Sequence, residues 1–552
     1  MATLNIGQSA LAAAQIGLDT TAHNIANAST PGYSRQVVVQ GASIPQNVGE
    51  GFRGQGVDVT SVKRIYNDFL ATQSRSAQTT KSGYDSYYMQ IRQVDNLLAD
   101  ADAGLSPVLQ DFFASVQELS SNPASMPARQ AVLSSAEGLP ARLRSLAVRL
   151  DEVGQGVNSQ VAASVGVVNT YAQQISALNE IISKLQSSTG QSPNDLLDQR
   201  DQLILDLNKE IKASVVKQGD GKYNVFIGSG QPLVVGSQTY SMTVQPSPFN
   251  PEKLGIGYQG ENGVVSIDDA SLSGGRLGGL LAFRSQSLEP AQNALGRIGI
   301  ALAGTFNTQH AQGLDLNGDP GGNFFTVPSP VVNSNLANTG DAEIAASISG
   351  PNALTTSDYE LHYADDGTNQ TYTLVRLSDQ NTTTYTKAVF EAGPQTVDGV
   401  EISLFSGTVV DGDSFLIRPT IKGAADIAVA ITDPAKIAAA DTDGGVGNNR
   451  NALLLSALQT ANTIGNSSAS FQGAYSHLVS TVGNKTRELE VTNSAAGKIL
   501  DEVTKSIQTE SGVNLDEEAA NLLRYQQAYQ AAAKVMQIAN EMFQLLLSLG
   551  NN

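Results

Sequence analysis

The last helix candidate of this chain reads NLDEEAANLLRYQQAYQAAAKVMQIANEMFQLLLSL, residues 514–549. Its apolar residues recur mostly at alternating steps of three and four, which is the spacing of one face of a coiled-coil helix. We call this face the C-terminal seam; it consists of Leu515, Leu522, Tyr525, Tyr529, Ala532, Met536, Ala539, Phe543 and Leu546, and Glu518 interrupts it. Burying these side chains stabilises the chain only if a partner covers them, so the stretch predicts a helix that needs another helix.

The opposite end of the chain supplies a candidate partner. Between Leu4 and Ile25 a second heptad pattern runs through mostly small residues, and a helix so poor in large apolar groups depends on packing for its stability. The residues expected to pack here are Leu4, Leu11, Ala14, Leu18 and Ile25, with Gly7 and Thr21 on the same face. The two terminal helices are expected to pair with each other and with neighbouring copies, and docking of each helix on its own subunit stays open.

Composition narrows the class of protein. The chain has 552 residues, a formal net charge of −19 and no cysteine. Without a basic patch, nucleic acid and anionic membranes are poor partners, and without cysteine no disulfide or thiolate metal site can form. The sequence has no apolar run long enough to span a membrane and no cleavable leader, so we expect no membrane insertion and no ordinary signal peptide.

The pattern of elements predicts a multidomain α+β protein that is mainly helical with inserted β domains. Long helices are expected to form a bundle body, starting near Val62 and including separate helices at Pro127–Gly138, Pro140–Val153 and Val157–Leu185. Alternating apolar residues at 215–267 and 342–421 predict the β domains, which would lie on the outside. The expected division is 1–30 plus 514–552 (terminal coiled coil), 31–62 (extended), 63–211 plus 277–315 plus 423–513 (helical body), 212–276 (small β region) and 316–422 (outer β domain).

No stretch carries a convincing catalytic, cofactor or metal motif. Asp315, Asn317 and Asp319 have the spacing of a calcium loop, but Pro320 stands where that loop needs glycine, and a turn is the better interpretation. The four histidines are dispersed and no serine sits in a nucleophile elbow. We therefore predict no enzyme, no cofactor and no metal site.

A short motif after the first helix identifies a family. Asn24-Ile25-Ala26-Asn27, followed by Thr30-Pro31-Gly32-Tyr33, resembles the N-terminal signature of the axial proteins of the bacterial flagellum. Further along, Phe112-Phe113, Asn122-Pro123 and the run 274–281 are similar to the hook-associated protein 1 family, whose members join the flagellar hook to the filament. The 514–522 run completes this resemblance.

The resemblance implies a structural role. It implies a ring of copies of the chain, with hook protein on one side and the next hook-associated protein on the other. It also implies secretion by the flagellar type III apparatus without a cleaved signal, and a cytoplasmic export chaperone on the C-terminal helix, so that the protein ends in the extracellular flagellum. The alternative is a secreted adhesin or effector that binds a host ligand through its β insertions.

Overall fold

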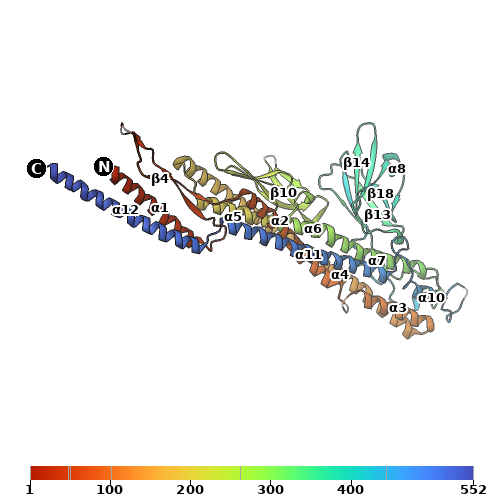
Figure 1. The fold of residues 1–552 in the computed structure, drawn as a ribbon. Helices are drawn as coiled ribbons and strands as arrows, with labels where there is room; N and C mark the ends of the chain where they lie inside the picture. The colour runs from red at the N-terminus through yellow and green to blue at the C-terminus, as the bar shows by residue number, and fades with distance from the viewer. Residues whose placement is uncertain are drawn as a thin grey trace.

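The computed structural model describes residues 2–47, 49, 51–100, 102, 104–260, 263–442 and 444–550. The molecule is elongated, with both chain ends at one end of its long axis and a β domain projecting sideways near the other end (Figure 1). Mainly helical architecture with inserted sheets agrees with the expected α+β class.

The first and last helices form an antiparallel pair. Helix α1 spans Ala2–Asn27 and α12 spans Leu515–Gly550, and the two run side by side over most of their length (Figure 1). The Asn514 side chain accepts the backbone N–H of Asp516 at 3.0 Å and so caps the start of α12. The expectation that the termini pair with each other is therefore confirmed within one chain.

A β hairpin connects the terminal pair to the body. Strand β1 (Gln36–Ala42) pairs antiparallel with β4 (Val57–Arg64), and the short strands β2 (Gln46–Asn47) and β3 (Phe52–Arg53) pair beyond them. The expected helix start near Val62 was wrong, because Val62 lies opposite Val38 in this ladder. The next helix, α2, begins only at Asp68, where Asn67 caps it.

Long helices build the body. They are α2 (Asp68–Leu98), α3 (Ser106–Ser121), α4 (Met126–Thr189) and α5 (Asn194–Glu210). The three helices expected between Pro127 and Leu185 are one continuous helix, α4, with Pro140 inside it. Buried residues continue at helical spacing through Leu139, Leu143 and Leu146, so packing of this face outweighs the backbone hydrogen bond that proline removes.

The chain later returns to the body after each β insertion. The returning elements are α6 (Gly275–Phe283), the π-turn η2 (Arg284–Leu288), α7 (Glu289–His310), α9 (Gly423–Asp426), η4 (Pro434–Lys436), α10 (Arg450–Ala457) and α11 (Phe471–Ser511). Helix α10 ends at Ala457, because the chain turns after Leu458 and Ile464 bridges to Ala469. Phe112, Phe306 and Phe324 pack ring against ring in the core that joins α3 to α7.

Two small antiparallel sheets lie on α4. One has the strand order β5-β6-β7-β8 and the other β11-β10-β9. Their strands are β5 (Ala213–Lys217), β6 (Tyr223–Ile227), β7 (Gln231–Val235), β8 (Gln238–Thr239), β9 (Met242–Ser247), β10 (Asn250–Gly260) and β11 (Gly263–Ile267), and the turn η1 (Asp269–Ser271) follows. The Asn179 side chain of α4 donates to the carbonyl oxygens of Tyr223 and Gly236, which ties the first sheet to the helix.

The projecting domain contains a five-stranded sheet, β12-β19-β14-β15-β16, and a three-stranded sheet, β13-β18-β17. The elements are β12 (Val331–Ser334), β13 (Glu343–Ile348), η3 (Pro351–Ala353), β14 (Tyr359–Asp365), β15 (Gln370–Arg376), β16 (Asn381–Thr386), α8 (Lys387–Glu391), β17 (Gln395–Val397), β18 (Val400–Ser406) and β19 (Ser414–Arg418). Its core is separate from that of the body, except that Ile300 of α7 belongs to it. This contact fastens the domain to the body.

No helix in the described part of the chain has both the length and the hydrophobicity needed to cross a membrane. The five-part domain division given above stays a prediction.

Candidate functional site

Small residues form the contact between α1 and α12. On α1 the buried positions facing this contact include Gly7, Ala14 and Gly17, and on α12 they include Ala532 and Ala539. Two large side chains of α12 use the room that the glycines leave. A Cβ atom on Gly7 would lie 2.9 Å from Cγ of Met536, and one on Gly17 would lie 2.5 Å from Cδ1 of Tyr525. The helices therefore approach closely because two glycines receive a methionine and a tyrosine.

The C-terminal end of α12 extends past its partner helix. Since Gly7 faces Met536 in this antiparallel pair, the first residue of α1 lies near Glu541, and the rest of α12 has no partner in the described chain. At about 1.5 Å per residue, the uncovered end is on the order of 13 Å long. We call it the apolar end of α12; its exposed side chains are Met542, Phe543, Leu545, Leu546 and Leu547.

The predicted packing residues fall into three groups. The buried ones are Ala14, Ala532 and Ala539; the half-buried ones are Leu4, Leu11, Leu18, Leu522, Tyr525 and Met536; and the exposed ones are Ile25, Leu515, Tyr529, Phe543 and Leu546. The structure brings the first group together with Met536 and Tyr525 in the seam. It leaves the leucines of α1 on the flank of the seam, because the small residues take the central positions.

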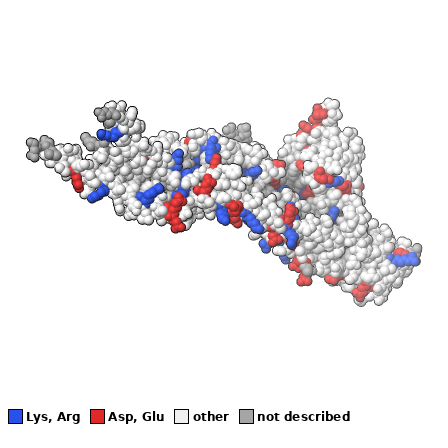
Figure 2. Space-filling view, viewed as in Figure 1, with Lys and Arg blue, Asp and Glu red and all other residues white. Residues whose placement is uncertain are grey.

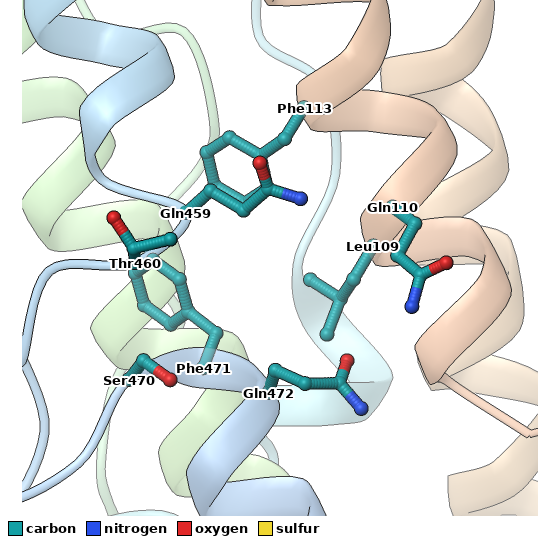
Figure 3. A pocket seen from close by; sticks show the side chains of 8 residues that line it. All are labelled: Leu109, Gln110, Phe113, Gln459, Thr460, Ser470, Phe471 and Gln472. Atoms are coloured by element: carbon teal, nitrogen blue, oxygen red, sulfur yellow. The ribbon is translucent and has the colours of Figure 1, made fainter.

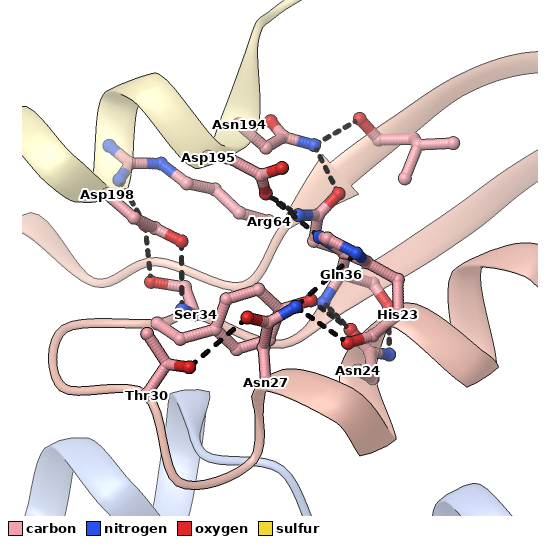
Figure 4. A network of polar contacts seen from close by, with 12 residues as sticks. His23, Asn24, Asn27, Thr30, Ser34, Gln36, Arg64, Asn194, Asp195 and Asp198 are labelled. Atoms are coloured by element: carbon pink, nitrogen blue, oxygen red, sulfur yellow. Dashed lines mark hydrogen bonds and ion pairs between the residues drawn. The ribbon is translucent and has the colours of Figure 1, made fainter.

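The family motif forms a polar joint at the end of α1 (Figure 4). The Asn24 side chain is buried, and its Nδ2 donates to the backbone oxygen of Gln36 at 2.9 Å while its Oδ1 accepts the Gln36 N–H at 2.9 Å. Asn24 thus pairs with the backbone as a neighbouring strand would. The hydroxyl of Tyr33 also donates to Oδ1 of Asn24, at 2.7 Å. Burial and nearby carboxylates raise the pKa of Tyr33, which keeps this donor protonated.

The remaining motif residues shape the turn. Asn27 donates to the backbone oxygen of His23 and accepts the Thr30 hydroxyl. Gly32 has a φ of +77°, a backbone conformation that favours glycine, and a Cβ there would also lie 3.1 Å from Cβ of Gln202. Ile25, Ala26, Thr30, Pro31 and Gly32 are exposed, whereas Asn27 and Tyr33 are half-buried.

Glu518, which interrupts the seam, connects α12 to this joint. Its side chain is 2% exposed, and its two carboxylate oxygens accept Nε of Arg35 at 2.8 Å and Nδ2 of Asn24 at 3.1 Å. Arg35 also donates two hydrogen bonds to the carboxylate of Glu517, at 2.7 and 3.0 Å. The joint therefore holds α1, the strand after it and the start of α12 together.

A second ion pair connects the joint to the body. Asp198 of α5 accepts both the backbone N–H and the hydroxyl of Ser34, each at 2.9 Å, and it pairs with Arg64 of β4 at 2.7 Å. Arg64 also pairs with Asp201 at 2.7 Å. Burial raises the pKa of Asp198, and the Ser34 and Arg64 donors oppose that rise. Movement of the terminal pair relative to α5 must break these contacts.

A separate pocket of about 460 Å³ lies at the far end of the body, between α3 and the start of α11 (Figure 3). Phe113 and Phe471 stack in its wall with ring centroids 6.1 Å apart, and Leu109 and glutamine, serine and threonine side chains form the rest. None of the eight labelled residues has an ionisable side chain. The Asp315 carboxylate, which belongs to the calcium-like spacing, accepts the backbone N–H groups of Asn317 and Asp319 and so serves its own turn.

Comparisons with known proteins decide the family. Residues 91–325 match the model of the flagellar hook-associated protein FlgK helical domain, and residues 333–419 match a D2-like domain of flagellar hook-associated protein 1. Over 99% of its length, and 99% of the relative's, the chain is 38% identical to flagellar hook-associated protein 1 of Escherichia coli. The chain belongs to the hook-associated protein 1 family. It is a structural component of the bacterial flagellum.

The two terminal segments of this hook-associated protein match family models of their own, and further relatives match the whole chain. Residues 4–33 match the flagella basal body rod protein model, and residues 507–549 match the C-terminal model of the basal body rod proteins FlgEFG. The chain is 39% identical to the Salmonella typhimurium relative and 26% identical to that of Bacillus subtilis, with 99% of this chain covered in each case. The structure of the flagellar hook junction protein FlgK from Burkholderia pseudomallei matches with a TM-score of 0.73 and 28% identity, covering 80% of this chain and all of that one.

Family membership does not favour the adhesin alternative for this hook-associated protein. Sequence reasoning missed Glu518, Arg35, Ser34, Asp198 and Arg64 as parts of the site. One signal for Glu518 was present, because a single acidic residue in an otherwise apolar seam needs a cationic or hydrogen-bonding partner. Nothing in the sequence connects Asp198 with Ser34, which is 164 residues away.

Proposed function

We propose that the paired terminal helices are the segment through which copies of this chain associate into a ring at the junction between hook and filament. The observation that carries the proposal is the apolar end of α12, where Leu546 is 68% exposed. A monomer gains nothing from these side chains in water, whereas neighbouring copies can bury them. The half-buried leucines of α1 lie beside the same seam and enlarge this surface.

The proposed position between hook and filament also indicates which proteins this chain contacts. We propose hook protein on one side of the ring and the next hook-associated protein on the other. Before assembly, an export chaperone in the cytoplasm would cover the apolar end of α12, and the chain would reach the outside through the flagellar export apparatus without cleavage of a signal. In this role the protein acts by packing, and no catalytic step is proposed.

The test compares two equally exposed leucines. Leu546→Asp changes the apolar end of α12, and Leu336→Asp changes a loop residue of the projecting domain that is 69% exposed. Purified full-length variants are bound to isolated hook ends and capped ends are counted by electron microscopy. We expect Leu546→Asp to lose capping while its circular dichroism and monomer stability stay unchanged, and Leu336→Asp to cap normally. Normal capping by Leu546→Asp would remove the apolar end from the proposal.

A further inference from the structure

We propose that adjacent copies in the ring contact each other through two rows of residues on opposite sides of the terminal pair. A row on α1 of one copy packs against a row on α12 of the next copy, and Asp19 of the first pairs with Arg524 of the second. This inference rests on the proposed ring association of the chain and names the surfaces that carry it.

Helix α12 carries a row of exposed residues beside its seam, which we call the α12 row. Its members recur at alternating steps of four and three, which is the spacing of a helix face that packs against another helix. They are Arg524, Ala528, Ala531, Val535, Ile538, Met542 and Leu545. Val535 and Ile538 are 42% and 47% exposed, and at about 1.5 Å per residue the row extends over about 30 Å. A monomer therefore leaves a complete helix-packing face in water.

Helix α1 carries a row with the same steps, which we call the α1 row. Its leucines are half-buried beside the seam and its other members are exposed. They are Leu4, Gln8, Leu11, Gln15, Leu18, Ala22 and Ile25. The β1–β4 hairpin packs on another side of α1, where the backbone N–H of Val57 donates to the Ser9 hydroxyl at 3.2 Å. The hairpin therefore leaves the α1 row open to a neighbouring copy.

The two rows lie on opposite sides of the terminal pair. At about 100° per residue, the α1 row is turned clockwise from Gly7 and Ala14 when α1 is viewed from its N-terminus. The α12 row is turned anticlockwise from Ala532 and Ala539 when α12 is viewed from its own N-terminus. Because the two helices are antiparallel, these turns point to opposite sides. Each copy therefore offers two different surfaces, as a closed ring of identical subunits requires.

The rows also match in height along the pair. Gly7 lies opposite Met536 and Gly17 lies opposite Tyr525, so each step along α1 corresponds to one step back along α12. The levels that coincide are Leu4 with Ile538, Leu11 with Ala531, and Asp19 with Arg524. Rotation about a ring axis parallel to the pair brings residues of equal height together. The large side chains of one row then meet small or apolar side chains of the other.

Asp19 and Arg524 are charges that this contact brings together. Asp19 is the only acidic residue of α1 and is exposed, and among the described residues no cation pairs with its carboxylate. Nη2 of Arg524 donates to the Tyr525 hydroxyl at 3.4 Å, and no carboxylate in the described part of the chain pairs with its guanidinium. Opposite charges at one level favour this pairing of copies over others and fix its register.

The charges around the α12 row agree with a second copy as its occupant. Residues 519–540 contain two basic residues, Arg524 and Lys534, and no acidic residue. The visible face of the terminal pair carries few charged side chains, whereas many lie over the body (Figure 2). Glu541 lies past the level of the α1 row and accepts a hydrogen bond from Gln537 at 3.0 Å, so it does not face Asp19. A helix with a single carboxylate suits this surface, and α1 of the next copy is such a helix.

Charge reversal in mixed copies tests the contact. Asp19→Arg places a cation opposite Arg524, and Arg524→Asp places a carboxylate opposite Asp19, so each variant alone should cap isolated hook ends about tenfold less well than the unmodified chain. An equal mixture of the two variants should recover capping, because each contact between unlike copies then joins opposite charges. Lys498→Asp, at an exposed lysine of α11, is the matched control and should cap normally.

Cross-linking identifies the neighbour directly, since the chain has no cysteine. Gln15→Cys in the α1 row and Ala528→Cys in the α12 row are mixed as single variants, assembled on isolated hook ends and treated with a short bismaleimide. Mass spectrometry should find a dimer that contains one copy of each variant. Gln526→Cys, exposed on the side of α12 away from the α12 row, replaces Ala528→Cys in the control and should give no such dimer. Circular dichroism verifies that every variant is folded.

The outcomes separate this inference from the proposed function. Normal capping by each charge variant alone, or no recovery of capping in their mixture, would overturn the contact between Asp19 and Arg524 and leave the role of the termini intact. Cross-links between like variants only would overturn the pairing of the α1 row with the α12 row. Failure of the unmodified chain to cap hook ends would overturn the proposed function, and this inference with it.

Discussion

Replacing Glu518 by alanine should loosen the terminal pair far more than replacing its neighbour Glu517. Both carboxylates accept hydrogen bonds from Arg35, so the two variants remove the same charge from the same partner. They differ in burial: the Glu518 side chain is 2% exposed and that of Glu517 is 54% exposed. The Glu517 side chain contacts the joint through Arg35, whereas the Glu518 side chain also accepts a hydrogen bond from Asn24.

The burial of each carboxylate sets how much stability its replacement by alanine is expected to cost. Removing one partner of a buried ion pair costs about 3–5 kcal/mol, because the other partner is left buried without its counter-charge. Arg35 keeps Glu517 in the Glu518→Ala variant, so we expect the lower end, about 3 kcal/mol. An exposed ion pair contributes about 0–1 kcal/mol, which is the expected cost of Glu517→Ala.

Hydrogen exchange of the α1 amides, followed by mass spectrometry, measures the free energy of opening the pair. A loss of about 3 kcal/mol should accelerate exchange in α1 by roughly a hundredfold, since 1.4 kcal/mol corresponds to a factor of ten. Glu517→Ala should accelerate it by no more than about fivefold. Amides of α4 serve as the internal reference. Equal acceleration by the two variants would refute the idea that the buried carboxylate holds the joint.

Two further predictions concern packing and pH. Gly156→Ala should stabilise the monomer by about 0.5–1 kcal/mol in urea unfolding, because nothing lies within 4 Å of the added methyl, whereas Gly17→Ala should weaken α1–α12 pairing in hydrogen exchange. The buried His310 accepts the Ala438 N–H at Nε2 and contacts the Gly322 oxygen through Nδ1, and burial lowers its pKa. Below about pH 6.5 the imidazole of residue 310 is protonated in the unfolded chain but not in the folded one. The free energy of unfolding should therefore decrease by about 1.4 kcal/mol for each unit by which the pH is lowered, and His310→Gln should remove this dependence on pH.

The terminal helices could be predicted from sequence because their signal is local. Heptad spacing in residues 514–549 and 4–25 marks the faces that pack, and both helices form where expected. The alternating residues of the β insertions are local in the same sense: strands β14 and β15 form within the expected range 342–421, with a turn at Asp365-Asp366-Gly367 between them.

Where the structure differs from the expectations drawn from sequence, contacts between residues far apart in the chain explain the difference. Val62 has the neighbours of a helix start, yet its partner in the β1–β4 ladder is Val38, and a strand results. Pro140 is a local helix breaker, yet α4 continues through it because its buried face is packed on both sides of the proline. In the seam, heptad spacing placed Gly7 on the packing face, where it meets Met536. The spacing left out Gly17, which comes close because the ring of Tyr525 needs the room of a glycine.

Asn24 shows why an asparagine, and no isosteric residue, suits the motif. Its Nδ2 donates to both the Gln36 oxygen and Glu518, while its Oδ1 accepts both the Gln36 N–H and the Tyr33 hydroxyl. Aspartate would lose both donor N–H groups and place a second carboxylate beside Glu518, and leucine would leave four polar groups in or beside the buried joint without their partner. The same side chain therefore fixes the end of α1, the start of β1 and the start of α12, so the motif positions the terminal pair on which assembly is proposed to depend.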